Sequence, residues 1–115
     1  MKFATHDEYF ATLPSEARIR LQQVQAEVER RVPHAVRCIS YNMPAFKVAR
    51  TFFYFAAFKK HIGVYPPVTN DHALIAETAR FRGPKGNLSF PLSEPLPLEL
   101  VGRVAVALSV QYARN

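Results

Sequence analysis

The chain has 115 residues, a length typical of one domain that buries about two thirds of its unfolded surface. Hydrophobic residues make up 49% and charged residues 21% of the chain, which excludes a disordered protein. The net charge of +6 suggests an anionic partner, although most lysines and arginines are dispersed as on a solvated surface.

Targeting signals and disulfides are not expected. The polar residues Thr5 to Glu8 leave no room for a hydrophobic leader. The most apolar stretch, 101–110, is interrupted by Gly102 and Arg103 and is shorter than the roughly 20 residues of a membrane span. Cys38 is the sole cysteine, as is common in a reducing compartment. We therefore expect a single cytoplasmic domain over residues 1–115, with no membrane association.

Two helices are predicted near the N-terminus. The first covers 7–13 and ends at Pro14, and the second begins at Ser15 and ends at Val32, before Pro33. In the second helix, apolar residues recur at spacings of three and four, which places them on one face: Ala17, Leu21, Val24, Val28 and Val32. This face is expected to pack on the core.

The pattern then changes to the alternation of strands, which are predicted at 36–41, 46–48, 51–58, 61–65 and 87–90, with a turn at 42–44. The segment 51–58 is apolar on both faces, so we expect a central strand covered on both sides. Helices at 71–79 and 97–112 complete the order. The last helix has a second apolar face that would be buried or form a homodimer contact.

This order of elements predicts the fold class. Helices precede and follow a run of strands joined by short connections. We expect an α+β single domain with an antiparallel sheet of about four to five strands and with the N- and C-terminal helices packed mainly on one face.

An aromatic strand, a Lys-Lys-His corner and a returning strand form the most informative part of the chain. Alternation on the returning strand directs Ile62 and Val64 toward the core, while His61 and Tyr65 lie on the opposite face. Gly63 is expected to leave a gap between these two side chains. A polar, partly basic surface of this kind is typical of a binding site.

Three motifs resemble segments of a known family. Residues 40–46 (SYNMPAF) are similar to its SYxMPxF segment, residues 55–66 contain its KKHIGxYP core, and residues 85–91 (KGNLSFP) are similar to its KGxLxFP strand. In these motifs and their order the chain resembles the YdhG-like domain family. The resemblance implies a small α+β fold, and most members have no known function. One branch is described as a frataxin-like intracellular iron chaperone that delivers iron for cluster and haem synthesis.

Iron delivery is therefore one hypothesis for the function. Weak, exchangeable iron binding needs oxygen ligands gathered on one surface. Carboxylates are few in this chain, Glu27 and Glu29 lie beside arginines, and no two histidines have ligand spacing. Asp7 and Glu8 are the carboxylates on which such a role would depend. No other cofactor is expected.

A small anionic ligand is a second hypothesis. The three motifs supply the candidate ligand-binding residues, which are Tyr41, Met43, Phe46, Lys59, Lys60, His61, Tyr65, Lys85 and Gly86. Lysine charge, tyrosine hydroxyls and loop amides together suit a carboxylate or a phosphate. The alternative is that Tyr41 and Tyr65 are core aromatics with their hydroxyls at the surface and that His61 is an ordinary strand-end residue.

Other classes of function find less support. Cys38 lies within a predicted strand, and Ser40 lacks the flanking glycines of a nucleophile elbow, so we expect no enzyme activity. No helix-turn-helix, RNP-like or zinc-finger pattern accompanies the basic residues, which argues against a nucleic-acid partner. A protein-interaction domain that uses the apolar C-terminal helix is the third hypothesis.

Overall fold

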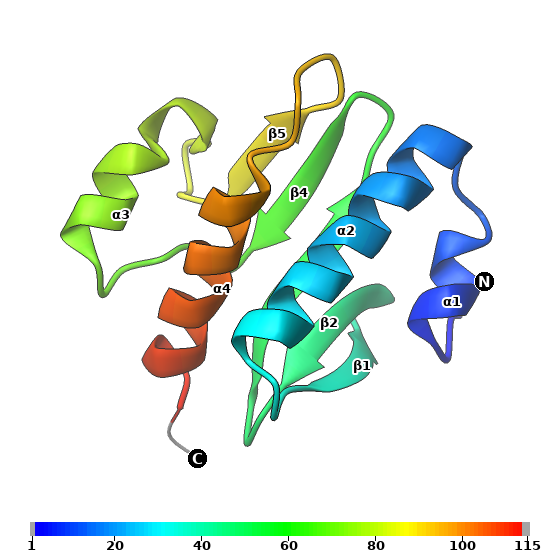
Figure 1. Cartoon of the computed structure of the whole chain (residues 1–115), viewed down its shortest axis with the longest axis horizontal. Helices are drawn as coiled ribbons and strands as arrows, with labels where there is room; N and C mark the ends of the chain where they lie inside the picture. The colour runs from blue at the N-terminus through cyan, green and yellow to red at the C-terminus, as the bar shows by residue number, and fades with distance from the viewer. Residues whose placement is uncertain (1, 114–115) are drawn as a thin grey trace.

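The computed structural model describes residues 2–113 and contains one antiparallel sheet of five strands (Figure 1). The elements in chain order are α1 (His6–Phe10), α2 (Ser15–Arg31), β1 (Val36–Ser40), β2 (Met43–Lys47), β3 (Thr51–Ala57), β4 (His61–Tyr65), α3 (His72–Glu77), the short 3₁₀ helix η1 (Ala79–Phe81), β5 (Leu88–Pro91) and α4 (Leu98–Gln111). Neighbouring strands in the chain are also neighbours in the sheet. The predicted α+β class with an antiparallel sheet is confirmed.

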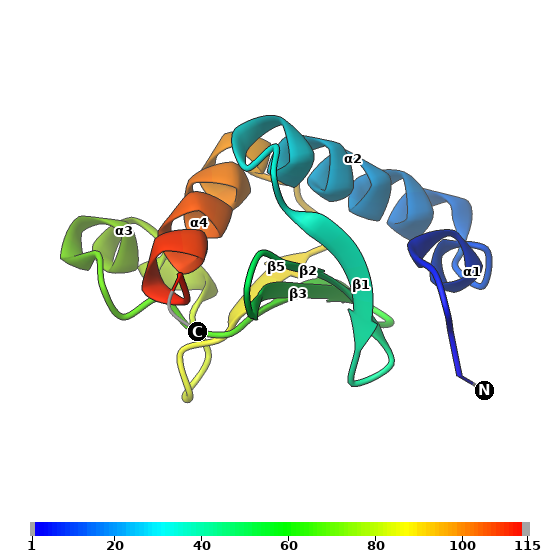
Figure 2. The same ribbon diagram turned by 90° about the horizontal axis from the view of Figure 1, so that it is seen from below.

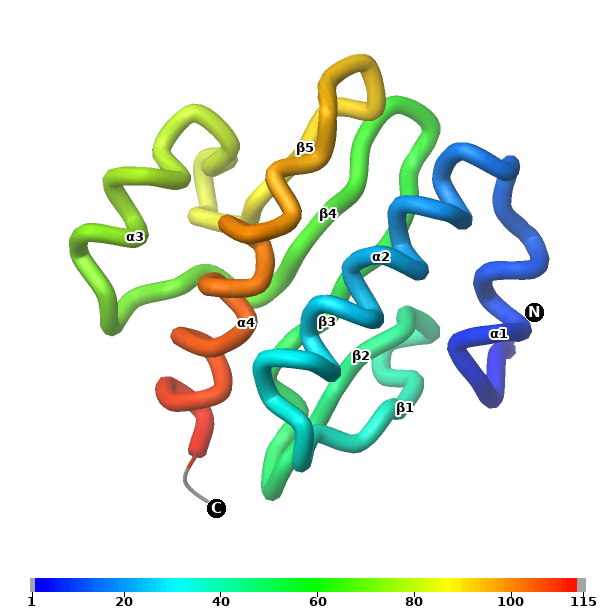
Figure 3. Tube along the Cα trace, in the orientation of Figure 1, coloured from blue at the N-terminus to red at the C-terminus, as the bar shows by residue number. Residues whose placement is uncertain are grey.

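The helices gather on one face of the sheet. α2 and α4 lie side by side across it, α1 lies beside β1 and β2, and α3 lies beside α4 (Figures 1 and 3). Figure 2 shows that none of the helices in residues 2–113 covers the opposite face. The core fills the space between the helices and the sheet, with fully buried side chains from both layers: Leu21, Val24, Val28, Phe46, Phe53, Phe55, Ile62, Val101, Val104 and Leu108. No helix within residues 2–113 has the length and hydrophobicity needed to cross a membrane.

A bulge in β3 explains why this strand is apolar on both faces in the sequence. The register shifts from Phe46–Phe53 to Lys47–Thr51, so Phe52 is an extra residue in β3. Because Thr51 shares the face of the exposed Lys47, alternation directs Phe52 to the helix side, next to Phe53. Both rings are buried in the core. The central position of β3 is confirmed, but the prediction that both of its faces are covered by packed elements is wrong.

The β1–β2 turn differs from the prediction. The turn consists of Tyr41 and Asn42, whose φ angles are 52° and 59°, and not of residues 42–44. Met43 and Pro44 are already part of β2, with Met43 paired to Ser40. Two left-handed residues in succession match the twist of a hairpin, but Asn-Gly is the usual sequence for such a turn. A tyrosine in the first position gives no recognisable turn signal.

His6 is a buried histidine that the sequence interpretation overlooked. It is 3% exposed, and its Nε2 lies 3.0 Å from the carbonyl oxygen of Cys38 and 2.9 Å from that of Ala45. The side-chain amide nitrogen of Gln25 lies 2.9 Å from Nδ1. The two carbonyl oxygens beside Nε2 favour a proton on that nitrogen, which leaves Nδ1 to accept from the Gln25 amide. His6 therefore connects α1 to the β1–β2 hairpin and to α2.

This histidine predicts a pH dependence of stability. Burial lowers the pKa of His6 below its ordinary value of 6.5, so just below pH 6.5 the unfolded chain binds a proton that the folded chain does not. The free energy of unfolding should be highest above pH 6.5 and should decrease as the pH falls through this value. The pKa values of Glu27 and Glu29 are lowered from 4.5 by hydrogen bonds from arginines, so their contribution is lost only at more acidic pH. Urea unfolding at several pH values between about 7 and 5 measures the effect.

The matched variant is His6→Gln, which keeps a side-chain N–H donor but cannot titrate. Its stability should be lower than that of the wild type at pH 7, because the fit to the two carbonyl groups is altered. Its free energy of unfolding should change less with pH over the same interval. An equally steep decrease in His6→Gln would show that another group causes the pH dependence.

Candidate functional site

The uncovered face of the sheet carries an aromatic surface. Tyr54 on β3 is paired with Tyr65 on β4, and both lie on the face opposite the helices. The ring of Tyr41, at the tip of the β1–β2 hairpin, lies 5.9 Å from the ring of Tyr54. Tyrosine presents an apolar ring together with a polar hydroxyl, so a cluster of three suits a ligand with both characters.

A hollow of about 390 Å³ lies over these rings, and we call it the tyrosine hollow. Its lining residues are Tyr41, Met43, Arg50, Thr51, Tyr54, Tyr65, Pro66 and Tyr112. Tyr112, at the end of α4, closes one side, and the guanidinium of Arg50 lies 5.4 Å from the centre of its ring. This cation–π contact holds a positive charge at the edge of an aromatic surface.

Tyr41 is held in an unusual conformation at this hollow. Its φ of 52° is rare for a bulky residue, and its side chain is 85% exposed. The ring is thus presented to solvent by a strained turn, with no burial of the side chain to offset the strain. Strain of this kind is concentrated at functional sites. The conformation supports a binding role for the face from which Tyr41 projects.

The gap expected at Gly63 is filled. A Cβ atom at Gly63 would lie 2.6 Å from the hydroxyl oxygen of Tyr65 and 3.0 Å from the ring of Phe58. The ring of Phe58 in turn stacks on His61, with 4.8 Å between ring centres and 18° between planes. The prediction of a hole is therefore wrong, because the side chains of Tyr65 and Phe58 fold over the glycine. Gly63 allows the Tyr65 ring to lie flat on the sheet.

A second hollow of about 320 Å³ lies beside the first, and we call it the basic hollow. Its lining residues are His61, Tyr65, Gly83, Pro84, Lys85, Asn87, Leu88 and Ser89. Its polar side chains make no hydrogen bond or ion pair with any of residues 2–113. Tyr65 lines both hollows, so the two are neighbours on one surface.

The loop before β5 forms the outer wall of the basic hollow. The N–H of Gly86 donates to the carbonyl of Gly83 at 2.9 Å, and the N–H of Gly83 donates to that of Asn87 at 2.8 Å. These two amides are therefore engaged within the loop itself. Figure 2 shows this loop and the β1–β2 hairpin extending past the sheet on the side without helices. The open face consequently has a raised border at both ends.

The charges of the chain are segregated between helices and sheet. Every Asp and Glu of the chain lies in α1, α2, α3 or α4, in the cap of α3, or in the loop after β5. The segments 30–70 and 78–93, which include all five strands, have no carboxylate. Arg50 and Lys85 line the two hollows and form no ion pair with residues 2–113. Arg50 and Lys85 therefore give the open face a positive charge, which attracts anions.

The structure brings together five of the nine predicted site residues. Tyr41, Met43 and Tyr65 line the tyrosine hollow, and His61 and Lys85 line the basic hollow together with Tyr65. These five residues are brought together on one face of the molecule. Their use as a ligand site stays a prediction.

Phe46 and Gly86 have structural roles that the sequence interpretation did not foresee. Phe46 is fully buried on the helix side, where its ring stacks on Phe55 at 5.9 Å and 7°. It does not reach the open face, so the assignment of Phe46 to the ligand surface is wrong. Gly86 has a φ of 89°, and a Cβ atom there would lie 2.9 Å from Pro67, so glycine is required by the loop.

Lys59 and Lys60 line a different hollow. This third hollow, of about 670 Å³, lies at the β3–β4 corner and includes Glu16, Arg20 and Glu94. Two carboxylates there offset the lysine charges. The sequence placed these lysines next to His61 along the chain, but the corner directs them to the helix-side end of the sheet.

Several lining residues escaped the sequence interpretation. Tyr54 was detectable, because it alternates with the core residues of β3 on the face of Tyr65. Ser89 was detectable in the same way from its place between the buried Leu88 and Phe90. Arg50 and Tyr112 gave no signal, because only the folded chain brings the end of α4 to the start of β3.

Comparison with protein-family models and with curated proteins finds no match to this chain. Among solved structures, it is similar to the crystal structure of YdhG from Bacillus subtilis, a protein of the DUF1801 family. The TM-score is 0.78 at 20% sequence identity, over 95% of this chain and 91% of that one. The fold is YdhG-like. The recognition from three short motifs is thus confirmed for the fold, and the likeness gives no activity.

Iron delivery, the role described for one branch of the YdhG-like family, requires side chains that can together hold a metal ion. Within residues 2–113, no three His, Cys, Asp or Glu side chains lie close enough to hold one metal ion. Of the two carboxylates in the first turn of α1, Glu8 already accepts a hydrogen bond from the N–H of Ala4 at 2.7 Å. The described part of this YdhG-like fold thus provides no ready ligand set for iron.

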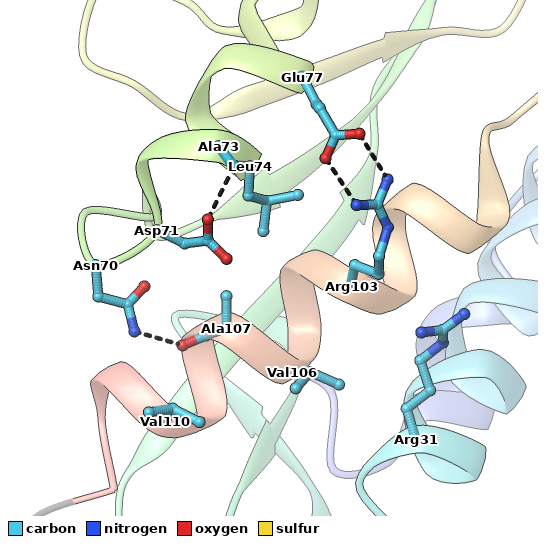
Figure 4. A pocket seen from close by; sticks show the side chains of 10 residues that line it. All are labelled: Arg31, Asn70, Asp71, Ala73, Leu74, Glu77, Arg103, Val106, Ala107 and Val110. Carbon is cyan, nitrogen blue, oxygen red and sulfur yellow. Dashed lines mark hydrogen bonds and ion pairs between the residues drawn. The ribbon is translucent and has the colours of Figure 1, made fainter.

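A groove of about 430 Å³ between α3 and α4 is another concave surface (Figure 4). Several of its polar groups are already engaged, since Asn70 donates to the carbonyl of Ala107 at 3.1 Å and Arg103 pairs with Glu77 at 2.7 Å, while the Nε of Arg103 has no hydrogen-bond partner among residues 2–113. Asp71 accepts from the N–H of Leu74 and caps α3. These contacts attach α3 to α4.

Proposed function

We propose that this YdhG-like protein binds a small anionic molecule in the basic hollow of its uncovered sheet face. The observation that carries the proposal is a concave site with Lys85, His61 and uncommitted hydroxyl and amide groups, on a sheet that has no carboxylate. Lysine and imidazole nitrogens donate charge-assisted hydrogen bonds to phosphate or carboxylate oxygens. Ser89 and Asn87 supply further donors around the same volume.

The expected affinity is modest. The hollow is open to solvent, so water and salt screen the attraction between Lys85 and an anion, with a screening length of about 8 Å at physiological ionic strength. Binding should therefore weaken when sodium chloride is added at constant pH. This salt dependence also separates an electrostatic site from burial of apolar surface.

Calorimetric titration with inorganic phosphate tests the proposal. Lys85→Ala should weaken binding about tenfold, which corresponds to about 1.4 kcal/mol. Lys60→Ala is the matched control, because it removes the same charge from the hollow that contains Glu16 and Glu94. Its phosphate affinity should stay close to that of the wild type.

The contrary results are distinct. Equal weakening by Lys85→Ala and Lys60→Ala would show that phosphate responds only to net charge and would refute a specific site. If the wild type binds neither phosphate nor a carboxylate anion such as citrate, the proposal is refuted altogether. Circular dichroism of both variants shows whether they fold.

A protein-interaction role finds less support. On α4, Val106 is 38% and Val110 65% exposed, beside the Arg103–Glu77 ion pair. Two valines next to a charged pair form a smaller apolar surface than a stable homodimer requires. Sedimentation over a range of concentrations measures this directly, and a dimer that Val110→Asp dissociates would establish the role.

A further inference from the structure

The two hollows of the open face form a continuous surface with two chemistries. Tyr65 borders both, so a ligand that leaves one hollow along β4 enters the other. The tyrosine hollow is aromatic, with one cation, Arg50, at its edge. The basic hollow has Lys85 and His61 with free donors. A ligand that fills both needs an apolar part and an anionic part.

The tyrosine hollow favours a flat ring. Tyr54 and Tyr65 are direct neighbours across β3 and β4, and Tyr41 approaches Tyr54 from the hairpin tip. Rings displayed on the open face of a sheet are platforms on which planar bases stack. The volume of about 390 Å³ lies within the range of about 300–1,000 Å³ that is usual for small-molecule sites.

The distance along β4 specifies what joins the two parts. His61 and Tyr65 are four residues apart on one strand, so their Cα atoms are about 13 Å apart at the usual rise of 3.3 Å per residue. A ring that lies over Tyr54 and Tyr41 is on the other side of Tyr65 from the basic hollow, so a spacer must join it to an anionic group beside His61. A ring, a spacer and an anionic group in sequence match this separation.

We infer that the ligand of the open face is a nucleotide, whose base lies in the tyrosine hollow and whose phosphate lies in the basic hollow. The inference rests on the proposed function, because the phosphate occupies the same basic hollow. The base stacks on Tyr54 and Tyr41, the sugar crosses Tyr65, and the phosphate accepts hydrogen bonds from Lys85 and His61.

Matched probes separate the two hollows in one calorimetric series. AMP, GMP and UMP are compared with ribose 5-phosphate, which has the same phosphate and sugar without a base. At least one nucleotide should bind ten times more tightly than ribose 5-phosphate or better. Tyr54→Ala should remove this advantage and leave the affinity for ribose 5-phosphate unchanged. Tyr54→Phe, which keeps the ring and lacks the hydroxyl, should retain it.

Lys85→Ala provides the complementary result. It should weaken the binding of the nucleotide and of ribose 5-phosphate by the same factor, because both place a phosphate in the basic hollow. Lys60→Ala should change neither. Chemical-shift changes in the titrated protein should then fall on β3, β4 and the loop 83–87.

Three results would overturn the inference. If no nucleotide binds more tightly than ribose 5-phosphate, while Lys85→Ala weakens both, the base has no site and only the anion site remains. If none of these phosphates binds, the proposed function fails as well. If a ten-residue oligothymidylate binds a hundredfold more tightly than TMP, the surface recognises a polymer strand instead of a single nucleotide.

Discussion

Phe46→Ala is expected to lower the free energy of unfolding by about 3–5 kcal/mol. Phe46 is 0% exposed, and its ring stacks on Phe55 and meets His6 edge-on at 5.3 Å. Truncation leaves a cavity between α1 and the sheet that the rigid neighbouring strands cannot close. Urea unfolding followed by circular dichroism measures the loss as a lower midpoint at an unchanged slope.

Phe46→Leu separates a core role from a ligand role. Leucine keeps much of the side-chain volume, so the loss of stability should be smaller than for alanine, and the variant should fold. Because Phe46 faces the helices, phosphate affinity in Phe46→Leu should equal that of the wild type. A folded Phe46→Leu protein that no longer binds phosphate would place this residue at the ligand site after all.

Gly63→Val is expected to destabilise the protein by about 1–3 kcal/mol. Valine is favoured in strands, so intrinsic propensity alone would predict a gain in stability. The loss instead follows from the Tyr65 hydroxyl and the Phe58 ring, which lie 2.6 Å and 3.0 Å from the position that the new Cβ would take. Thermal unfolding of the variant and the wild type measures the difference.

Two variants check this explanation. Gly83→Ala is the matched glycine control, because the nearest atom to its new Cβ is the carbonyl oxygen of Asn87 at 3.7 Å, an ordinary contact. It should leave stability nearly unchanged. Adding Tyr65→Ala to Gly63→Val should cost less than the sum of the two single changes, because the colliding side chain is removed. A Gly63→Val protein as stable as the wild type would show that Tyr65 swings away freely.

The secondary structure was largely predictable because its signals are local. The spacing of Leu21, Val24 and Val28 predicts α2, and Pro33 sets its end, since a proline disfavours helical geometry in the residue before it. The turn at Tyr41 and Asn42 and the bulge at Phe52 were not predictable. A left-handed tyrosine has no propensity signal, and a bulge depends on the register of a partner strand.

The candidate site was predictable only in part. Alternation correctly places His61 and Tyr65 on the same face of β4, because a strand has a fixed period of two. The face of Phe46 and the separation of Lys60 from His61 were missed. The first depends on how the strands pair and the second on how the β3–β4 corner turns. Neither can be read from which residues are adjacent in the sequence.

The sequence by itself determined which segments of the chain carry negative charge and which do not. The absence of carboxylates from 30–70 and 78–93 is a property of the chain before it folds. Only the tertiary structure decided that these segments share one open face, because α2 and α4 both pack on the other side of the sheet. Only it brought Tyr112 to Arg50 and the loop around Lys85 to His61. Burial of apolar area determines which face of the sheet the helices cover. The cations and the tyrosines, whose charges and hydroxyl groups are costly to bury, stay on the other face.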